Sequence, residues 1–505
     1  MTQYTRRQYL LGVGTLPLAS IAPADRELWW SPPDDAVSYS EGRYGFIVSV
    51  EPDSLEEFRE DVEGYDNVSW LESREHAASG TVTIVAPPGD IGIRQRDRAF
   101  GNGLAHLSYV ESVELNRTIS LADPIEPAGS NAWSGTGFGT QNYLKVFGEG
   151  ALSKSGVAFD SDMQEGPIGN VHTHTRADAV TVDTSGLTIG VVDTGVNYGE
   201  AIPESRLLST STDFTDGDAT GTDAVEDTDG HGSWVASCMA SELTGDYAGF
   251  LPAADVLGCK ALEDGQGTID DIAAGIRHAA DEGADVMCLS LGSFQFSQAI
   301  QNALEYAVEQ GTIPVAANGN DRQMSRWLSH PASSEQTIAV GSTTAALPSE
   351  SRSAYYSNIG PHNGISDNSG GETQGAMPDI GAPGCKLTAQ VPQPSGSDSL
   401  ETLTGTSMAA PVVAGVIGLY LAENPGTDFE TVREGLHRTA APIPNAAEEE
   451  IGHGMPDAEA LLAGTEPDTP QAEAMTDEAE TRGVAYSTLS GGMYPRLLAS
   501  AQQRF

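Results

Sequence analysis

Three polar residues that are far apart in the chain have the side chains that amide hydrolysis uses. Asp193 ends an apolar run, His231 lies in Asp-Gly-His-Gly, and Ser407 lies in Gly-Thr-Ser-Met-Ala-Ala-Pro. A serine hydroxyl is a poor nucleophile at neutral pH and needs an adjacent base, which an acid in turn orients. These residue types, in this order, predict nucleophilic acyl transfer.

Each of the three has a plainer explanation when taken alone. Asp193-Thr194-Gly195 fits a turn at a strand end or an aspartic protease, His231 fits a structural helix start, and Ser407 fits a helix cap. Together they are more specific, because the order acid, histidine, serine differs from that of chymotrypsin and of α/β-hydrolases. The Gly-x-Ser-x-Gly elbow of the α/β-hydrolases is also missing around Ser407.

The seven letters around Ser407 match the subtilase serine motif without a mismatch, and residues 187–464 resemble the subtilase catalytic domain throughout. The chain also resembles secreted proteases of halophilic archaea. The resemblance implies an α/β fold with a mainly parallel sheet and helices on both faces. It implies a serine endopeptidase that needs no cofactor, forms an acyl-enzyme on Ser407, and uses His231 as base and Asp193 to orient it.

The same resemblance implies further site residues. Residues 312–321 align with the family strand that ends in Ala-Gly-Asn, which assigns the oxyanion-hole amide to Asn320, with Asn318 as the alternative. Residues 289–292 resemble the segment that pairs with an extended substrate. The expected substrate-binding residues are Ser290, Leu291, Gly292, Ala317 and Asn318. One departure is Trp234, which stands where the family usually has a histidine outside the triad.

The elements that must position these residues follow from the apolar pattern. Short apolar runs alternate with helical stretches from residue 187 onward, which predicts a mainly parallel sheet covered on both faces. We expect a catalytic domain at 186–464, after a linker and irregular start at 119–185 and before an acidic flexible tail at 465–505. The expected strands are 188–192, 255–260, 285–290, 312–317 and 337–341, and the expected helices are 232–241, 269–282, 298–310 and 408–422.

A small α+β pattern precedes this domain, at about residues 40–118. Strands at 44–50, 80–86 and 109–115 and a helix at 54–63 are expected there. The size and position resemble the subtilase propeptide, which acts as a folding template and an intramolecular inhibitor. An ordinary accessory domain is the alternative.

The first residues predict export. Arg6-Arg7-Gln8-Tyr9-Leu10-Leu11 opens a short uncharged apolar stretch that ends in small residues, as a signal peptide does. The adjacent arginines resemble a twin-arginine signal over residues 1–24, with a chance arginine pair on an ordinary secretory signal as the alternative. We therefore expect a secreted, extracellular protein without a membrane anchor.

The acidic composition argues against some classes of binding partner. With 25 Lys+Arg and 72 Asp+Glu, the net charge is 25 − 72 = −47, and the acids are spread along the whole chain. This argues against nucleic acids and anionic membranes, which attract basic patches. Apolar runs such as 412–422 argue against a disordered acidic chain. A folded monomer adapted to high salt, acting on polypeptides, is the expectation.

The cysteines, two histidines and a group of aspartates are considered as disulfide or metal-binding residues. Cys238, Cys259, Cys288 and Cys385 are too few for a disulfide scaffold and are expected as small buried residues, although one bridge is conceivable. His172 and His174 are expected on a surface loop rather than on a metal. A structural Ca²⁺ ion is conceivable at a set of five carboxylates, with solvated side chains as the default: Asp213, Asp216, Asp218, Asp223 and Asp227.

Three functions are therefore compared. The leading one is an endopeptidase that cuts its own propeptide and then digests extracellular proteins. A catalytically silent secreted binding protein with the same fold is the alternative from another class. A processing protease with few substrates is the third.

Overall fold

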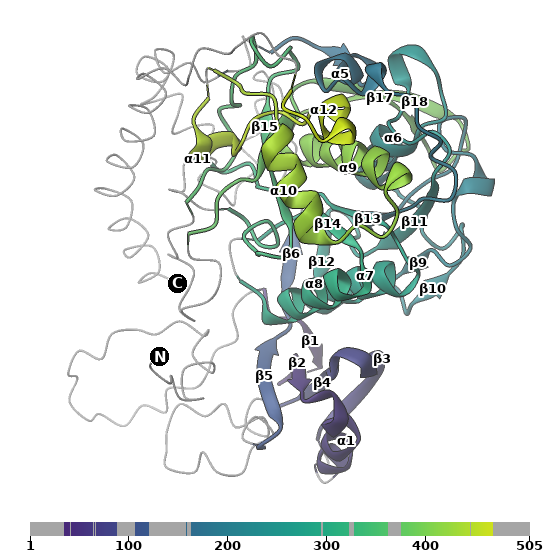
Figure 1. Ribbon diagram of the computed structural model, residues 1–505. Helices are drawn as coiled ribbons and strands as arrows, with labels where there is room; N and C mark the ends of the chain where they lie inside the picture. The colour runs from purple at the N-terminus through teal and green to yellow at the C-terminus, as the bar shows by residue number, and fades with distance from the viewer. Residues whose placement is uncertain are drawn as a thin grey trace, which may run out of the picture.

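The computed structural model describes residues 35–87 except 41, 64 and 66, residues 107–120, residue 158, and residues 163–467 except 294–295, 323–327, 362–374 and 445. They form two domains, a small one at the N-terminal end and a larger one (Figure 1). The expected signal peptide, most of the expected linker and nearly all of the expected tail lie outside the described residues.

The N-terminal domain is an antiparallel sheet with one helix against it. The strands are β1 (Ser38–Ser40), β2 (Arg43–Val50), β3 (Ser69–His76), β4 (Thr81–Ala86) and β5 (Val110–Leu115). Helix α1 (Leu55–Glu63) turns Leu55, Phe58 and Val62 towards the sheet, at a spacing that puts them on one helix face. The expected elements are present, and β1, which is exposed, and β3, with its charged sequence, are additions.

The larger domain is built on an eight-stranded sheet in the order β10-β9-β11-β8-β13-β14-β15-β16. All neighbours pair in parallel except β9 and β10. The strands are β8 (Thr188–Asp193), β9 (Thr212–Asp213), β10 (Ala219–Thr220), β11 (Asp255–Lys260), β13 (Val286–Leu289), β14 (Ile313–Ala317), β15 (Ile338–Thr343) and β16 (Ile380–Pro383).

Helices cover both faces of this sheet, as the apolar strands predict (Figure 1). One face packs against α6 (His231–Ala240), α9 (Thr406–Glu423), α10 (Phe429–Thr439) and α12 (Ala458–Ala463), and the other against α7 (Ile269–Asp281) and α8 (Gln298–Gln310). Helix α9 is long and apolar enough to cross a bilayer, but 83% of its 18-residue window is buried in the domain. It is a core helix.

Shorter elements complete the chain. Strands β17 (Leu387–Pro392) and β18 (Asp398–Leu403) form a hairpin that β7 (Gly166–Pro167) extends. Strand β6 (Thr118–Ser120) pairs with β12 (Gln266–Thr268). The remaining helices are α5 (Gly169–His174) and α11 (Glu448–Ile451), with 3₁₀ turns at Pro52–Ser54, Ala77–Ser79, Ala177–Ala179, Glu204–Arg206 and Gly245–Tyr247.

The N-terminal domain lies against α7 and α8 of the larger domain (Figure 1). Ile47 of β2 and Ile119 of β6 are buried in the same apolar cluster as the residues of α7 and α8. The chain leaves the small domain through β6, which adds an antiparallel strand to β12 of the larger one. The two domains therefore share both an apolar contact and a backbone ladder.

Two expectations about isolated residues can be compared with the structure. All four cysteines are buried and free, so none is in a disulfide. His172 and His174 lie on helix α5 rather than on a loop, and the ring of His172 packs on Phe250 at 4.3 Å between centroids. The sequence around them is too short to show helical periodicity, which is why a loop was expected.

Candidate active site

Three neighbouring strands of the large sheet end at the same edge and carry residues of the expected site there. Strands β8, β13 and β14 are adjacent. Asp193 is the last residue of β8, Ser290 follows β13, and Asn320 lies three residues beyond β14. The carboxyl edge of a parallel sheet is where ligand crevices form.

Helix α6 begins at His231, whose side chain contacts Asp193. Gly230 caps the helix with φ of 91°, a backbone conformation that glycine adopts without strain. A Cβ added to Gly232 would lie 2.2 Å from the carbonyl oxygen of Gly195, so only glycine lets α6 approach the end of β8 so closely. His231 Nδ1 and Asp193 Oδ1 are 2.7 Å apart in a buried hydrogen bond.

The surroundings fix both partners of this pair. Asp193 Oδ1 also accepts hydrogen bonds from the backbone N–H of Thr194 at 2.7 Å and from its hydroxyl at 3.3 Å. Burial disfavours the charged imidazole, but the carboxylate of Asp193, with smaller contributions from Asp229 and Asp227, raises the pKa of His231 above its ordinary value. His231 Nε2 is buried and has no hydrogen-bond partner among the described residues.

Asp227 holds the turn that leads to His231, a role that was not predicted for it. Its side chain is buried and accepts hydrogen bonds from the backbone N–H groups of Asp229 at 3.2 Å, Gly230 at 2.8 Å and Ser233 at 2.8 Å. It therefore caps the first turn of α6. A run of acidic residues gave no sign of which carboxylate turns inward.

Ser407 is the second residue of α9 and is held on Ser290. Its hydroxyl donates to the Ser290 carbonyl at 3.1 Å, and the Ser290 hydroxyl donates back to the Ser407 carbonyl at 2.9 Å. No hydrogen bond joins Ser407 to His231. The structure thus brings Asp193 and His231 into contact and places Ser407 at the end of the adjacent strand, with its hydroxyl turned to Ser290.

Asn320 lies beside the start of α9. Its side-chain oxygen accepts from the backbone N–H and the hydroxyl of Thr406, both at 2.9 Å. These two bonds fix which end of the amide is the oxygen. A Cβ added to Gly405 would lie 3.2 Å from Asn320 Nδ2, so the amide donor lies next to the backbone that precedes Ser407.

Comparisons with known proteins agree with this geometry. Residues 184–460 match the model of the subtilase family. The chain belongs to the subtilase family. It is 33% identical over 267 residues to the thermophilic serine proteinase of Bacillus sp. (strain AK1), covering 52% of this chain and 59% of that protein.

Two further relatives widen the comparison. The halolysin-like extracellular serine protease of Natrialba magadii is 35% identical over 299 residues, covering 57% of this subtilase and 50% of the relative. Thermitase of Thermoactinomyces vulgaris is 32% identical over 263 residues, covering 51% of this subtilase and 82% of thermitase. The chain spans between half and three fifths of the length of the first two relatives.

The fold has a solved counterpart. Fervidolysin from Fervidobacterium pennivorans, a keratinolytic enzyme related to subtilisin, superposes with a TM-score of 0.60 at 20% identity, over 86% of this subtilase and 64% of that chain. At this identity the likeness shows the fold. It confirms the predicted fold class, an α/β domain with a mainly parallel sheet preceded by a small separate domain.

The expected substrate-binding residues are in the interior or at its edge. Leu291 is buried in the cluster with α7 and α8, and a Cβ added to Gly292 would lie 2.8 Å from Ser329 Cβ. Ala317 and Asn318 are buried at the end of β14. Both polar atoms of the Asn318 side chain are buried without a hydrogen-bond partner among the described residues.

The five aspartates considered for Ca²⁺ do not converge. Asp213 accepts from the backbone N–H of Thr215, Asp223 accepts from the hydroxyl of Tyr198, and Asp218 pairs with Arg74 of the N-terminal domain. Asp227 caps α6, and Asp216 is exposed to solvent. Within the described part of the chain, no group of three or more His, Cys, Asp or Glu side chains could hold a metal ion. These residues therefore do not fit a common Ca²⁺ site.

Trp234 is accommodated by packing. Its side chain is fully buried in α6, and its indole N–H donates to the carbonyl of Glu401 in β18 at 3.0 Å. A buried indole needs such an acceptor. The departure from the family pattern therefore ties α6 to the β17–β18 hairpin.

Proposed function

We propose that this subtilase is a secreted serine endopeptidase that hydrolyses peptide bonds of extracellular proteins through an acyl-enzyme on Ser407. The observation that carries the proposal is the buried His231–Asp193 bond, which holds the imidazole by Nδ1 and leaves His231 Nε2, which has no hydrogen-bond partner among the described residues, to act as the base. The serine motif at Ser407 supplies the nucleophile.

The first step needs one change from the observed geometry. In the proposed step the Ser407 side chain rotates away from Ser290 and its hydroxyl bonds to His231 Nε2, since hydrogen bonds at such sites often tighten only with substrate present. The proton passes from Ser407 Oγ to Nε2 as Oγ bonds to the substrate carbonyl carbon. Asp193 accepts from Nδ1–H throughout and stabilises the imidazolium that forms.

Negative charge then develops on the substrate carbonyl oxygen. The backbone N–H of Ser407 is in the first turn of α9, where helix N–H groups have no partner within the helix. Together with Asn320 Nδ2 it would form the oxyanion hole. His231 next gives its proton to the leaving amine, and a water molecule repeats the sequence to release the acid and regenerate Ser407.

The substrate would bind as an extended strand. Strand β12 already takes β6 as an antiparallel partner, and Gly267 of β12 packs on Ala261, whose backbone N–H donates to the Asp193 carbonyl at 2.9 Å. This edge and residues 290–292 would be the two walls for the peptide. Only the second wall could be predicted, because the three residues Gln-Gly-Thr of β12 carry no strand signal.

The N-terminal domain would be the propeptide. It covers α7 and α8, and the chain leaves it along β12, in the direction of the proposed substrate site. In this proposal it helps the enzyme fold, inhibits it, and is cut off by the enzyme itself. Export through the twin-arginine pathway, action as a monomer and adaptation to high salt complete the proposal, supported by the arginine pair and the charge of −47.

The test is the replacement Ser407→Ala in the full chain, with Ser395→Ala, on an exposed loop, as the control. We expect the Ser407 variant to remain uncut, to leave casein intact and to resist a fluorophosphonate, whereas the control and the parent are processed and labelled. The loss of turnover should be about 10⁶-fold, the size found in subtilisin. Processing of the Ser407 variant would contradict the assignment.

A silent binding protein is the second candidate. The Ser407 hydroxyl bonded to Ser290 instead of His231 is the observation that favours it. Fluorophosphonate labelling of the parent protein separates the two, because only an activated serine reacts. An unlabelled parent protein would support the binding function.

A further inference from the structure

The N-terminal domain holds the start of both helices that it covers. Glu114 accepts from the hydroxyl of Ser297 at 3.0 Å and from the backbone N–H of Ala299 at 3.1 Å, at the start of α8. Asn116 donates to Asp270 at 2.6 Å, at the start of α7. These contacts orient the domain, and each is a hydrogen bond between residues more than 150 positions apart in the chain.

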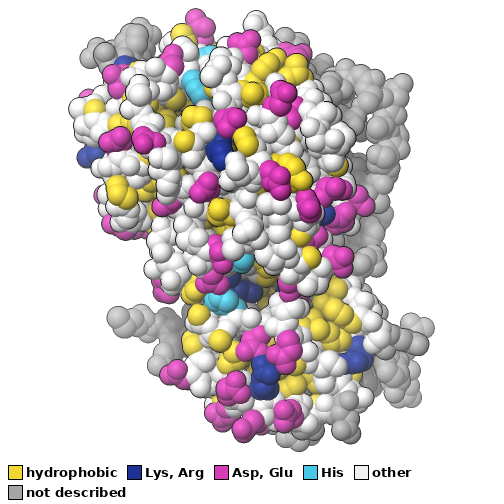
Figure 2. Space-filling model, turned by 90° about the vertical axis from the view of Figure 1, so that its right-hand side faces the viewer, with side chains coloured by type: hydrophobic (Ala, Val, Ile, Leu, Met, Phe, Trp, Pro, Cys, Tyr) yellow, Lys and Arg dark blue, Asp and Glu magenta, His cyan; other side chains and the backbone are white. Residues whose placement is uncertain are grey.

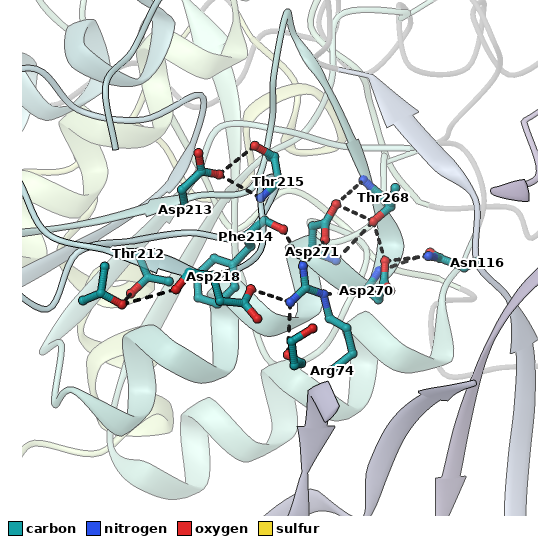
Figure 3. Close-up of polar contacts among 12 residues, drawn as sticks. Arg74, Asn116, Thr212, Asp213, Phe214, Thr215, Asp218, Thr268, Asp270 and Asp271 are labelled. Carbon is teal, nitrogen blue, oxygen red and sulfur yellow. Dashed lines mark hydrogen bonds and ion pairs between the residues drawn. The ribbon is translucent and has the colours of Figure 1, made fainter. Parts of the chain in front are cut away.

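One contact is of a different kind. Arg74 of β3 reaches into the larger domain, and its side chain is only 9% exposed (Figure 3). Its guanidinium pairs with Asp218, lies 2.8 Å from Asp271 and 4.0 Å from Asp270, and also donates to the Phe214 carbonyl. We call Asp218, Asp270, Asp271 and Phe214 the guanidinium pocket.

The pocket is completed from outside the larger domain. Among the described residues, Arg74 is the one basic side chain within ion-pair distance of Asp218, Asp270 and Asp271. Asp270 is 3% exposed and Asp271 13% exposed, so these charges are largely removed from water. Buried carboxylates that lose their counter-charge are strongly destabilised.

The shape of the pocket also fits a guanidinium better than an ammonium ion. The acceptors come from the β9–β10 loop on one side and from the first turn of α7 on the other (Figure 3). The planar fork of arginine reaches both sides at once, which a single ammonium nitrogen does not. The ring of Phe214 lies 6.0 Å from the guanidinium carbon.

We propose that the guanidinium pocket is the anchor that holds the N-terminal domain on the catalytic domain, and that Arg74 sets how long the two remain together. The inference rests on the proposed inhibitory role of the N-terminal domain and names the contact that controls it. Both domains carry an excess of acid, so the pocket turns part of that repulsion into attraction at one point.

The chain offers a matched control. Arg59 is the same residue type in the same domain, but its ion pairs with Glu72 and Glu75 stay inside the N-terminal domain. If any arginine of the small domain affected the interface through stability alone, Arg59 and Arg74 would behave alike. If the guanidinium pocket is the anchor, only the replacement of Arg74 will affect the interface.

The experiment is hydrogen exchange on the full chain carrying Ser407→Ala, which needs no catalytic activity. Arg74→Met should speed exchange of the interface amides of Ile269 and Ala299 by about 100-fold to 3,000-fold, the loss expected on breaking a buried ion pair. The β2–β4 ladder inside the small domain should exchange as before. Arg59→Met should leave Ile269 and Ala299 unchanged.

A variant on the other side of the interface covers the case in which Arg74→Met unfolds the small domain. Asp218 has φ of 60°, which asparagine tolerates, so Asp218→Asn keeps the loop and removes the charge. It should speed exchange of Ile269 and Ala299 in the same direction. Unchanged exchange at these amides in Asp218→Asn would overturn the anchor.

A second readout uses the chain with Ser407 intact. Arg74→Met and Asp218→Asn should shorten the lag between cleavage and the appearance of peptidase activity, and Arg59→Met should not. An inactive parent protein would contradict the proposed function. The anchor would still be tested by hydrogen exchange, which needs no activity. An unchanged lag in an active enzyme, with unchanged exchange, would defeat the anchor alone.

Discussion

At the scale of single residues, Asp193 is the most constrained group of the site. One of its oxygens takes the hydrogen bonds from His231 and from both donors of Thr194, in a setting with no solvent exposure. Such a carboxylate fixes the imidazole tautomer and ring plane, and its charge keeps the pKa of His231 above the ordinary value despite burial.

Asp193→Asn should separate these two effects. Activity requires neutral His231, so it rises with pH through the pKa of that group. Removing the negative charge lowers this pKa, and the acidic limb of the pH profile should move to lower pH. The turnover number should also fall by about 10⁴, because the amide favours the wrong tautomer, as the same change does in trypsin.

The measurement is kcat/KM on a peptide substrate from pH 4 to 9, with Asp183→Asn as the control. Asp183 binds only the start of the neighbouring turn and lies away from the site. A profile of Asp193→Asn with its acidic limb at the parent position would mean that another group titrates.

The role of a single residue could be predicted from the sequence where a short motif carries it, and not where folding brings distant residues together. The letters around Ser407, His231 and Asp193 could be assigned because they are sequence motifs with a fixed order. Asp227 could not, because its role depends on three backbone N–H groups that only the folded turn brings together. The bond from Ser407 to Ser290 joins residues 117 positions apart and has no sequence signal.

At the scale of elements, the apolar core strands were predicted best. Strands β8, β11, β13, β14 and β15 are buried on both faces, so their sequences are short continuous apolar runs. Strands β3 and β18 were missed because both carry exposed charged residues and are defined by their partners β4 and β17. The buried strands β16 and β17 were missed as well, because their short apolar runs are interrupted by glycine, proline, threonine or glutamine. Whether such segments form strands depends on their partner strands, and the local sequence does not show which segments will pair.

Helix α9 shows how an element sets the position of the nucleophile. Its polar start holds Ser407, and its body crosses the sheet with nearly every side chain buried. A Cβ added to Gly415 would lie 2.6 Å from Cβ and Cγ of Phe250. Phe250 cannot move aside easily, since these atoms are close to its own backbone. The distance between α9 and the backbone of Phe250 is therefore fixed at this point.

Gly415→Ala should therefore destabilise the domain by about 1–3 kcal/mol through overpacking, in spite of the better helix propensity of alanine. Gly435→Ala in α10 is the control. There the added methyl meets only the flexible end of Leu461, at 3.2 Å, and stability should change little. Thermal unfolding of both variants in the Ser407→Ala background, where self-cleavage does not interfere, measures the difference. Equal midpoints would show that α9 shifts freely.

At the scale of the whole molecule, acid is distributed over both domains. Figure 2 shows Asp and Glu side chains scattered over the upper and the lower body, while Lys and Arg side chains are few, with some at the boundary between the bodies. With a net charge of −47, repulsion acts against the compact state as a whole. Specific ion pairs such as that of Arg74 offset it only locally.

Salt should therefore stabilise this protein broadly. Dissolved ions shorten the screening length from about 10 Å at 0.1 M to about 3 Å at 1 M, which weakens repulsion between exposed carboxylates on different elements. We expect the unfolding temperature and the activity to rise steeply with NaCl and to be lost on dilution into low salt. Circular dichroism and peptide hydrolysis across a salt series measure both.

Neutralising surface acid should then lower the salt requirement. Glu309, Glu423 and Glu434 are exposed, lie on three different helices and have no ion pair among the described residues. Their joint replacement by glutamine removes three charges without removing a contact, so the same stability should be reached at lower NaCl. Sucrose, which stabilises proteins without screening charge, should not replace the salt. Full stability of the parent protein in buffer without added salt, or equal salt dependence of the triple variant, would mean that the acidic surface is not what couples this fold to its medium.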